Sequence, residues 1–184
     1  MMIREALPSD ANKIAKLIIQ AMDDLAAKFI GATDPYEAIP LFERFAGLPG
    51  NQYSYENILL YVEEGEICGM ISAYDGADLE MLRAPFLAYI EQTYGLKHVL
   101  EAETQAGEYY LDCISVAPGK QGKGIGKELI KAMLDYAVAH HHIIGLLVSK
   151  ENPKAEKLYA NLGFKVIRER DFMGGQYFHM QIIR

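Results

Sequence analysis

The sequence predicts a single α/β domain over residues 1–184, built on a mixed β-sheet of about seven strands with helices on both faces. Three observations predict this fold. Segments with helical spacing of apolar residues alternate with short segments typical of strands. A chain of 184 residues, about half of them apolar, can form one well-packed core but is short for two domains. No repeat, low-complexity tract or linker divides it.

The first part of the chain predicts a strand, a helix and a second, interrupted helix. Residues 2–6 are typical of a short strand. Ser9 or Asp10 can cap the helix that follows, in which apolar residues keep helical spacing as far as Leu25. Around residues 36–45, in a stretch rich in Gly, Pro and Asn, we expect a broken helix and then a loop.

The middle of the chain predicts a hairpin followed by a helix. Residues 58–62 and 67–74 have the composition of strands and flank a Gly-containing turn. Residues 77–94 show the spacing of a helix. Because residues 76–106 are longer than a plain strand connection requires, we expect a helical insertion there.

The remaining elements complete the order βα(α)ββ(α)βαβαββ. Pro153 follows a potential cap at Asn152, and Gly163 lies just past the end of the same helix, which is the usual arrangement of these residues. The other expected elements are strands at 109–116 and 143–148, an amphipathic helix at 125–138, and a closing hairpin of 164–168 and 177–183.

The composition excludes several classes of protein. A net charge of −7 argues against a nucleic-acid-binding surface. No apolar run approaches the roughly 20 residues of a membrane span, and residues 1–10 lack the features of a secretion signal. Cys68 and Cys113 lie far apart in apolar runs, which favours two buried free thiols in a reducing, cytoplasmic compartment over a disulfide or a metal site.

The charges are unevenly distributed. Residues 20–57 and residues 76–108 each hold six acidic and two basic side chains, whereas residues 119–131 hold four lysines and one acid. The two acidic segments could form an acidic mouth that attracts a cationic molecule, although surface acids that only aid solubility would give the same count.

The informative stretch is Leu111–Lys127, with the sequence LDCISVAPGKQGKGIGK, where a strand ends, glycines follow and a helix begins. This order directs free backbone N–H groups and the positive end of a helix dipole at one point. Glycines allow close approach because they carry no Cβ. The segment therefore predicts a site for an anion, above all a phosphate.

Spacing separates three phosphate-binding schemes. The P-loop pattern fails because Glu128 follows Gly126 and Lys127, where Ser or Thr is required. The dinucleotide pattern GxGxxG fails because the glycines alternate and lie late in the chain. The pattern [Q/R]xxGx[G/A] is met by residues 121–126.

With this pattern the chain resembles the GNAT superfamily of N-acetyltransferases, which use acetyl-CoA. A second block, Asn152-Pro153-x-Ala155-x-x-x-Tyr159-x-x-x-Gly163-Phe164, lies at the separation that the family shows. The two blocks cover residues 109–170, and the N-terminal half agrees only in the order of its elements. The resemblance implies a GNAT-like sheet whose strands at 109–116 and 143–148 splay to admit the cofactor. It also implies that residues 20–57 and 76–108, including the helical insertion expected at 76–106, line the acceptor side.

The resemblance implies how acetyl-CoA would be held. The backbone of the glycine loop would bind the pyrophosphate, strand residues would offer backbone groups to the pantetheine arm, and lysines would add positive charge. A plain glycine-rich turn and a solvated lysine face are the alternatives. The implied cofactor-binding residues are Ile114, Ser115, Val116, Gln121, Gly122, Lys123, Gly124, Ile125, Gly126, Lys127, Asn152, Ala155 and Tyr159.

Tyr159 matches the tyrosine that protonates the leaving CoA thiolate in many members of the family. A phenol suits this role because the thiolate is a developing anion. Tyr159 could instead be a core aromatic, since Ala155 and Leu162 share its helical face. Asn152 would contact the CoA arm, or it could be an ordinary helix cap; both can hold.

Asp112 is a candidate base, since an ammonium must lose a proton before the amine attacks a thioester. Rival carboxylates are Glu101, Glu103 and Glu108, and Asp112 could be a structural acid. The run of histidines at 140–142 is expected to be a polar helix end, so we expect no metal.

These observations predict an N-acetyltransferase that moves the acetyl group of acetyl-CoA to a primary amine of a small, cationic molecule or a peptide. A degenerate member that senses acyl-CoA without turnover remains an alternative, as does a transferase of longer acyl chains. We expect neither nucleic-acid nor membrane partners, and a homodimer through the C-terminal hairpin is conceivable.

Overall fold

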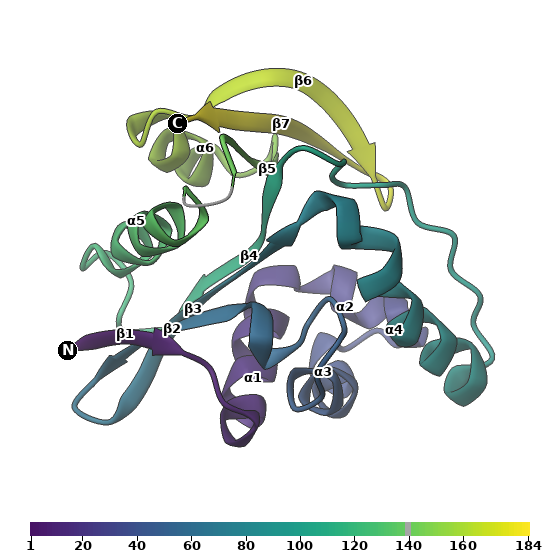
Figure 1. Cartoon of the computed structure of the whole chain (residues 1–184). Coiled ribbons are helices and arrows are strands. Elements are labelled where there is room, and N and C mark those ends of the chain that lie inside the picture. The colour runs from purple at the N-terminus through teal and green to yellow at the C-terminus, as the bar shows by residue number, and fades with distance from the viewer. Residues whose placement is uncertain (139–140) are drawn as a thin grey trace.

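The computed structural model describes residues 1–138 and 141–184, so the expectation for His140 lies outside the described residues. The helices and strands follow the predicted order (Figure 1). The strands are β1 (Met2–Glu5), β2 (Ile58–Glu63), β3 (Glu66–Asp75), β4 (Tyr109–Val116), β5 (Ile143–Ser149), β6 (Lys165–Phe172) and β7 (Gly175–Ile183). The helices are α1 (Ala11–Met22), α2 (Asp24–Ile30), α3 (Ile39–Ala46), α4 (Leu79–Tyr94), α5 (Ile125–Ala137) and α6 (Pro153–Asn161), with short 3₁₀ turns η1 (Pro8–Asp10), η2 (Pro35–Ala38), η3 (Tyr55–Asn57) and η4 (Gly76–Asp78).

The seven strands form one mixed sheet in the order β1-β2-β3-β4-β5-β7-β6, which confirms the predicted fold class. All neighbours are antiparallel except β4 and β5. That parallel pair is short: only Tyr109–Leu111 is in register with Ile144–Leu146. Beyond these residues the two strands separate, as the family resemblance implied.

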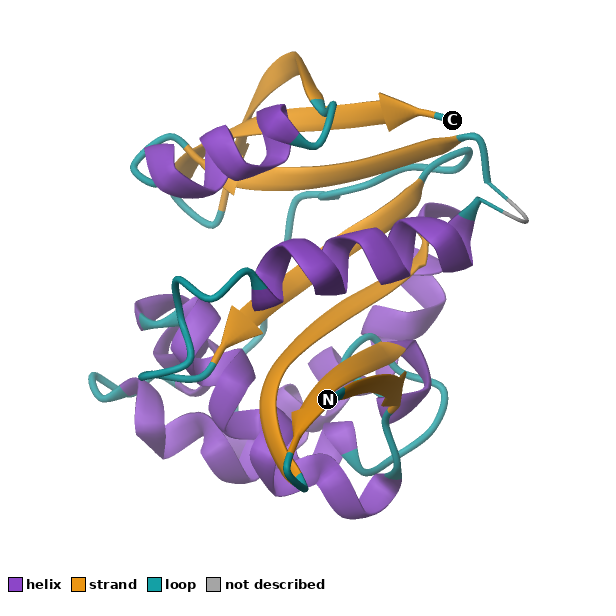
Figure 2. Cartoon of the chain, turned by 90° about the vertical axis from the view of Figure 1, so that its left-hand side faces the viewer, coloured by secondary structure: helices purple, strands orange, loops and turns teal. Residues whose placement is uncertain are grey.

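Helices cover both faces of the sheet and bury two separate cores (Figure 2). The amphipathic face of α5 packs on one side, against apolar residues of β3, β4 and β5 such as Ile71, Leu111 and Leu146. On the other side, α1, α2, α3 and α4 enclose an aromatic cluster in which Phe86 contacts Phe29 and Phe42. The division into two cores follows from the apolar residues of the strands, which alternate between the faces.

The first predicted helix differs from the observed one. Apolar spacing predicted one helix as far as Leu25, but Asp23 adopts φ 47° and divides it into α1 and α2. A non-glycine residue in this region is uncommon, and hydrophobic periodicity cannot detect it because the spacing continues across the break. The carboxyl end of α1 and the start of α2 thereby turn toward the C-terminal end of β4.

The insertion expected at residues 76–106 is helical only in its first half. Helix α4 ends at Gly95, whose φ of 70° is typical of a helix C-cap. Residues 95–108, which we call the strap, then run without regular structure from the end of α4 past the β6–β7 turn to β4 (Figure 1).

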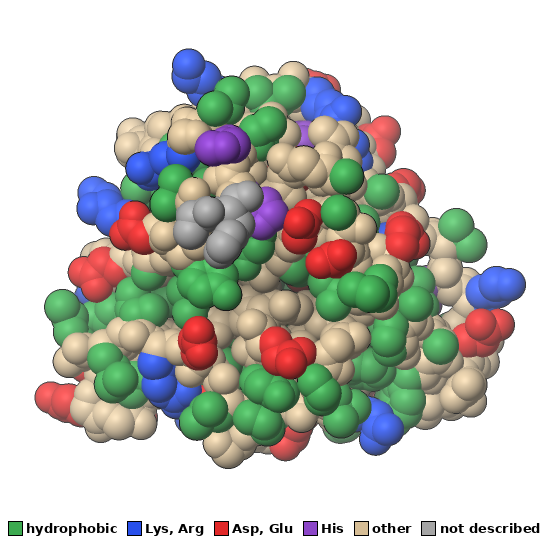
Figure 3. All heavy atoms as spheres, in the orientation of Figure 1, with side chains coloured by type: hydrophobic (Ala, Val, Ile, Leu, Met, Phe, Trp, Pro, Cys, Tyr) green, Lys and Arg blue, Asp and Glu red, His purple; other side chains and the backbone are tan. Residues whose placement is uncertain are grey.

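The two cysteines are free, as expected, but only Cys68 is fully buried; Cys113 is half-buried. None of the helices in residues 1–138 and 141–184 has the length and apolar character needed to cross a bilayer. On the face shown in Figure 3, acidic side chains are spread across the middle, and lysine and arginine side chains lie mainly toward the edges.

Candidate functional site

A cavity of about 640 Å³ opens where β4 and β5 separate. Its walls include Asp112–Ile114 of β4 and Leu147–Ser149 of β5, both just beyond the last paired residues. Because β5 no longer pairs with β4 there, backbone groups on that edge of β4 are left for a ligand. The cavity extends from the start of α6 to the α1–α2 junction and the strap.

One end of the cavity holds four residues that the sequence assigned to the cofactor: Ile114, Asn152, Ala155 and Tyr159. The Asn152 side chain accepts a hydrogen bond from the backbone N–H of Ala155 at 3.1 Å, so the predicted helix cap is confirmed. Asn152 also lines the cavity, so the cap does not exclude contact with a ligand.

The glycine loop lies past the end of β4 and outside the cavity lining, together with Ser115 and Val116. Gly122 and Gly124 have φ of 76° and 86°, and a Cβ on either would meet nothing within 4 Å. Gly124 caps α5, whose first intrahelical bond runs from Glu128 N–H to Gly124 O. The amides of Ile125, Gly126 and Lys127 therefore remain for an anion.

Side chains tie this loop to the rest of the fold. The carbonyl of Val116 accepts hydrogen bonds from Gln20 at 2.8 Å and from Gln121 at 3.1 Å, so its capacity is already used. Lys120 forms an ion pair with Glu63 at 2.6 Å, which compensates much of its charge. Of the lysines near the loop, Lys123 and Lys127 thus keep the freer charges, and the Ile125 side chain is buried in the α5 core.

Tyr159 is both a core aromatic and a cavity residue. It is 8% exposed and packs edge-on against Phe164, with ring centroids 6.0 Å apart. Burial raises the pKa of Tyr159 above its ordinary value, with a smaller contribution from Cys113. The phenol therefore stays protonated at neutral pH and can only donate a proton or a hydrogen bond to an anion that forms beside it.

Asp112 faces the same cavity from β4. The β3–β4 register shifts between Ser72 and Ala73, so Ser72 pairs with Cys113, Ala73 pairs with Leu111, and Asp112 has no partner. This irregularity brings Asp112 and the adjacent Cys113 both to the cavity, which strict alternation along β4 would not do.

The Asp112 carboxylate is poorly satisfied. Its Oδ2 is buried and has no hydrogen-bond partner among the described residues. Burial, and then the charge of Glu103, raise the pKa of Asp112 well above its usual range. A carboxylate whose pKa is raised toward the working pH is a better base as long as it is ionised when the ammonium arrives.

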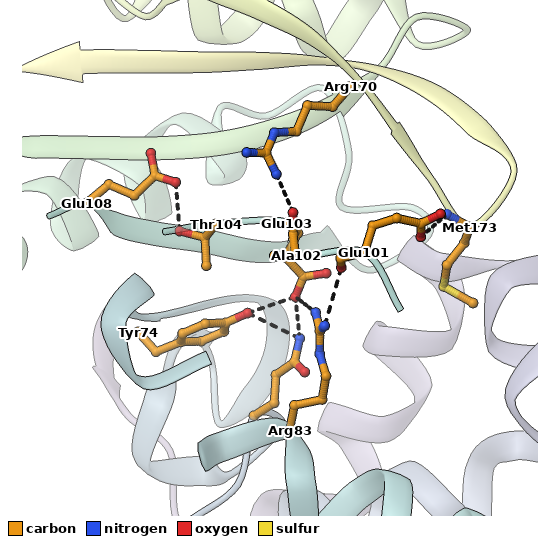
Figure 4. A network of polar contacts seen from close by, with 10 residues as sticks. Tyr74, Arg83, Glu101, Ala102, Glu103, Thr104, Glu108, Arg170 and Met173 are labelled. Atoms are coloured by element: carbon orange, nitrogen blue, oxygen red, sulfur yellow. Dashed lines mark hydrogen bonds and ion pairs between the residues drawn. The ribbon is translucent and has the colours of Figure 1, made fainter. Parts of the chain in front are cut away.

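The other end of the cavity contains a buried polar network that the sequence analysis missed in part (Figure 4). Arg83 of α4 and Glu103 of the strap form an ion pair at 3.0 Å. Glu103 also accepts hydrogen bonds from Tyr74 and Gln52. Arg83 could have been found as the charged residue on the stripe that Leu79, Phe86 and Ile90 make along one face of α4.

The three carboxylates that rival Asp112 as the base differ in whether they reach the cavity. Glu103 lines the cavity. Glu108 does not, because it is buried against His179, at 2.9 Å, and accepts further hydrogen bonds from Thr104 and Gln181. Glu101 binds the backbone N–H of Met173 at the surface.

Of the two acidic segments, only part reaches the cavity. Asp23 and Asp24 line it from the α1–α2 junction, with Glu103 from the strap. Lys28 and Arg83 are the basic residues of these segments that share the lining. Within residues 1–138 and 141–184, no cluster of three or more His, Cys, Asp or Glu side chains is arranged to hold a metal ion.

Comparison with known proteins gives a consistent result. Residues 18–164 match the model of the acetyltransferase (GNAT) family. A solved structure described as an acetyltransferase is 31% identical, covers 100% of this chain and 99% of its own, and superposes with a TM-score of 0.83.

Two curated relatives are polyamine enzymes. The spermine/spermidine N(1)-acetyltransferase of Bacillus subtilis (strain 168) is 27% identical over 65% of this chain and 80% of its own length. The spermidine N(1)-acetyltransferase of Vibrio cholerae is 42% identical over 69 residues, which are 35% of this chain and 40% of that enzyme. The second match thus spans less than half of the relative.

Proposed function

Because the chain belongs to the acetyltransferase (GNAT) family, we propose that it transfers the acetyl group of acetyl-CoA to a primary amine of a small cationic molecule. The observation that carries this proposal is the cavity between the splayed strands β4 and β5, which is lined by Tyr159 and by Asp112, whose buried Oδ2 has no hydrogen-bond partner among the described residues. The same cavity thus contains one group that can donate a proton and another that can accept one.

The residues present fit acetyl-CoA. The open glycine loop and the free amides at the start of α5 can bind the pyrophosphate, and the unpaired edge of β4 can bind the pantetheine arm. Asn152 and Ala155 would lie along the same arm. Acetyl-CoA supplies the activated acetyl group as a thioester.

Asp112 and Tyr159 divide the proton transfers. An acceptor arrives as an ammonium, and Asp112 takes one N–H proton, directly or through a water, so that the nitrogen lone pair becomes available. As the C–N bond forms and the C–S bond breaks, Tyr159 would give its O–H proton to the departing sulfur, and the second proton of the attacking nitrogen would return through water to the Tyr159 phenolate. Charge is thereby removed from both reactants while they are held together.

The lining favours a cationic acceptor. The five acidic lining residues, Asp23, Asp24, Glu103, Asp112 and Glu151, outnumber the basic side chains Lys28 and Arg83. Polyamines, the substrates named for the B. subtilis and V. cholerae relatives, are the first molecules to try, ahead of neutral amines.

The test is release of free CoA thiol from acetyl-CoA with a panel of polyamines, monoamines and peptide amines. We expect turnover with cationic amines, and Tyr159→Phe should lower kcat by about 10²- to 10⁴-fold. Tyr36→Phe is the matched control, since Tyr36 is 66% exposed and outside the cavity. Binding of acetyl-CoA without thiol release for any amine would instead support the acyl-CoA sensor. Faster turnover with longer acyl-CoAs than with acetyl-CoA would identify a transferase of longer acyl chains.

A further inference from the structure

Three charged side chains meet in the acceptor end of the cavity, but only two of them are paired. Arg83 and Glu103 are 3% and 4% exposed, and their ion pair joins Nη2 to Oε1 at 3.0 Å. Asp112 lines the same cavity, and its Oδ2 has no hydrogen-bond partner among the described residues. Two carboxylates therefore share the neighbourhood of one guanidinium, which is bound to one of them.

The structure fixes which carboxylate holds Arg83. Oε1 of Glu103 also accepts hydrogen bonds from Gln52 at 2.8 Å and from Tyr74 at 2.9 Å, and Figure 4 shows the Tyr74 hydroxyl beside it. Arg83 Nη1 donates to the backbone carbonyl of Glu101 at 3.3 Å, whereas Nη2 meets Glu103 as an ion pair without hydrogen-bond geometry and Nε has no hydrogen-bond partner among the described residues. These contacts direct Arg83 toward Glu103.

This arrangement matters because an arginine paired with Asp112 would weaken it as a base. An opposite charge within about 4–6 Å lowers the pKa of a carboxylate by about 1–3 units. An Asp112 bound to Arg83 would have a lower proton affinity and would compete poorly for the proton of an ammonium. Beyond the effect of burial, the charge of Glu103 raises the pKa of Asp112, whereas the charge of Arg83 lowers it, so a Glu103 that pairs with Arg83 opposes the influence of Arg83 on Asp112.

Resting on the function proposed above, we infer that Glu103 is a positioning residue that holds Arg83 away from Asp112 and so leaves the Asp112 carboxylate free to take the acceptor's proton. In that step an N–H bond of the ammonium breaks and an O–H bond forms on Asp112. In this step Glu103 transfers no proton; burial raises its pKa, and the pairing with Arg83 and the hydrogen bonds from Tyr74 and Gln52 oppose this rise.

Other titratable groups near Asp112 do not account for the same effect. Burial raises the pKa of the surrounding phenols and of the Cys113 thiol, so these groups stay neutral through the range in which Asp112 titrates. The groups that face Asp112, or share the cavity with it, are Tyr53, Tyr74, Arg83, Glu103, Tyr110 and Cys113, with Asp23, Asp24, Lys28, Glu151 and Tyr159 in the wider lining.

The experiment measures kcat/KM for one α,ω-diaminoalkane as a function of pH. At low pH kcat/KM is expected to fall, and this fall is the low-pH limb of the profile. Because the same amine is used throughout, a shift of this limb between variants reports a change in the pKa of a group on the enzyme. Glu103→Gln should move this limb to lower pH by about one unit or more and reduce the plateau of kcat, since Arg83 becomes available to Asp112. Arg83→Met should move the limb to higher pH, because both carboxylates then lack a cation.

The double variant Arg83→Met, Glu103→Gln should return the limb toward the wild-type position, since the two charges act on Asp112 in opposite directions. It leaves no buried unpaired guanidinium, so it also serves if Glu103→Gln alone does not fold. Glu101→Gln, on the same strap but outside the cavity, should leave the limb in place. Thermal unfolding of each variant verifies the fold.

The outcomes are distinct. Opposite shifts in the single variants and a restored limb in the double variant support the inference. The inference would be overturned if the wild type turns over but the low-pH limb does not move in the single variants. It would also be overturned if the limb of the double variant is displaced as far as that of Glu103→Gln. Either result would leave the proposed function standing. A wild type that releases no thiol with any amine would overturn both.

Discussion

Gly145 of β5 allows Glu108 to cross the sheet. Glu108 precedes β4, and its side chain passes over Gly145 to reach His179 and Gln181 on β7, two strands away. A Cβ on Gly145 would overlap Oε2 of Glu108, would lie 2.8 Å from its Cδ and would crowd Nε2 of His179 at 3.2 Å. Gly145→Ala should therefore expel the carboxylate from its site.

The cost follows from the contacts that are lost. Glu108 accepts hydrogen bonds from Thr104 at 2.7 Å, His179 at 2.9 Å and Gln181 at 2.7 Å. Each bond to a charged group contributes about 1.5–3 kcal/mol, and breaking a buried pair costs about 3–5 kcal/mol in total because the terms are not additive. We expect Gly145→Ala to lower the free energy of unfolding by about 3–5 kcal/mol, a large part of the ~5–15 kcal/mol of a typical domain.

Urea unfolding followed by circular dichroism measures this loss. With an m-value of about 2–3 kcal/mol/M the midpoint should fall by about 1–2.5 M. Gly47→Ala is the matched control, because its Cβ would find ordinary contacts at 3.5 Å; it should be neutral or stabilise by up to about 1 kcal/mol. In a Glu108→Ala background the cost of Gly145→Ala should largely vanish. A Gly145→Ala midpoint within error of the wild type would refute the reasoning.

Where the sequence carries strong local patterns, it predicted the fold closely. The strand at 109–116 and the helix start at Ile125 are observed at the predicted residues, because an apolar strand, a glycine stop and an amphipathic stripe each restrict the backbone. The α1–α2 break could not be predicted. Apolar spacing continues through Asp23, and the left-handed φ of that residue depends on how the chain turns toward the cavity.

The two ends of the site differ in the same way. Asn152, Ala155 and Tyr159 lie within one short helix and its cap, so their spacing alone placed them together. The acceptor end is assembled from segments far apart in the chain: Gln52 before β2, Arg83 in α4, and Glu103 in the strap. Their meeting depends on tertiary packing and on the path of an irregular segment, and a single sequence contains no periodic signal for either.

Three further predictions concern single side chains. Hydrogen bonds from His179, Thr104 and Gln181 outweigh burial and lower the pKa of Glu108, so its stabilisation is lost as the pH falls below about 4.3; Glu108→Gln should flatten the acid decline of the unfolding free energy. Gly124→Ala imposes a left-handed alanine at about 1–2 kcal/mol and should weaken CoA binding in calorimetry, whereas Gly65→Ala, at a similar φ in the β2–β3 turn, should not.

Asp112→Asn should abolish the base yet stabilise the fold. Because burial raises the pKa of Asp112 in the folded state, the carboxyl favours folding below its unfolded-state value, and this contribution disappears as the pH rises through the folded-state value. At neutral pH the wild type must hold an unpartnered buried charge or take up a proton, and asparagine needs neither. The Tm of Asp112→Asn should thus exceed that of the wild type near pH 7–8, and the two should converge below about pH 4, where both side chains are neutral. An equal or lower Tm of the variant at neutral pH would show that Asp112 is satisfied in the folded protein, and its assignment as an available base would fail with it.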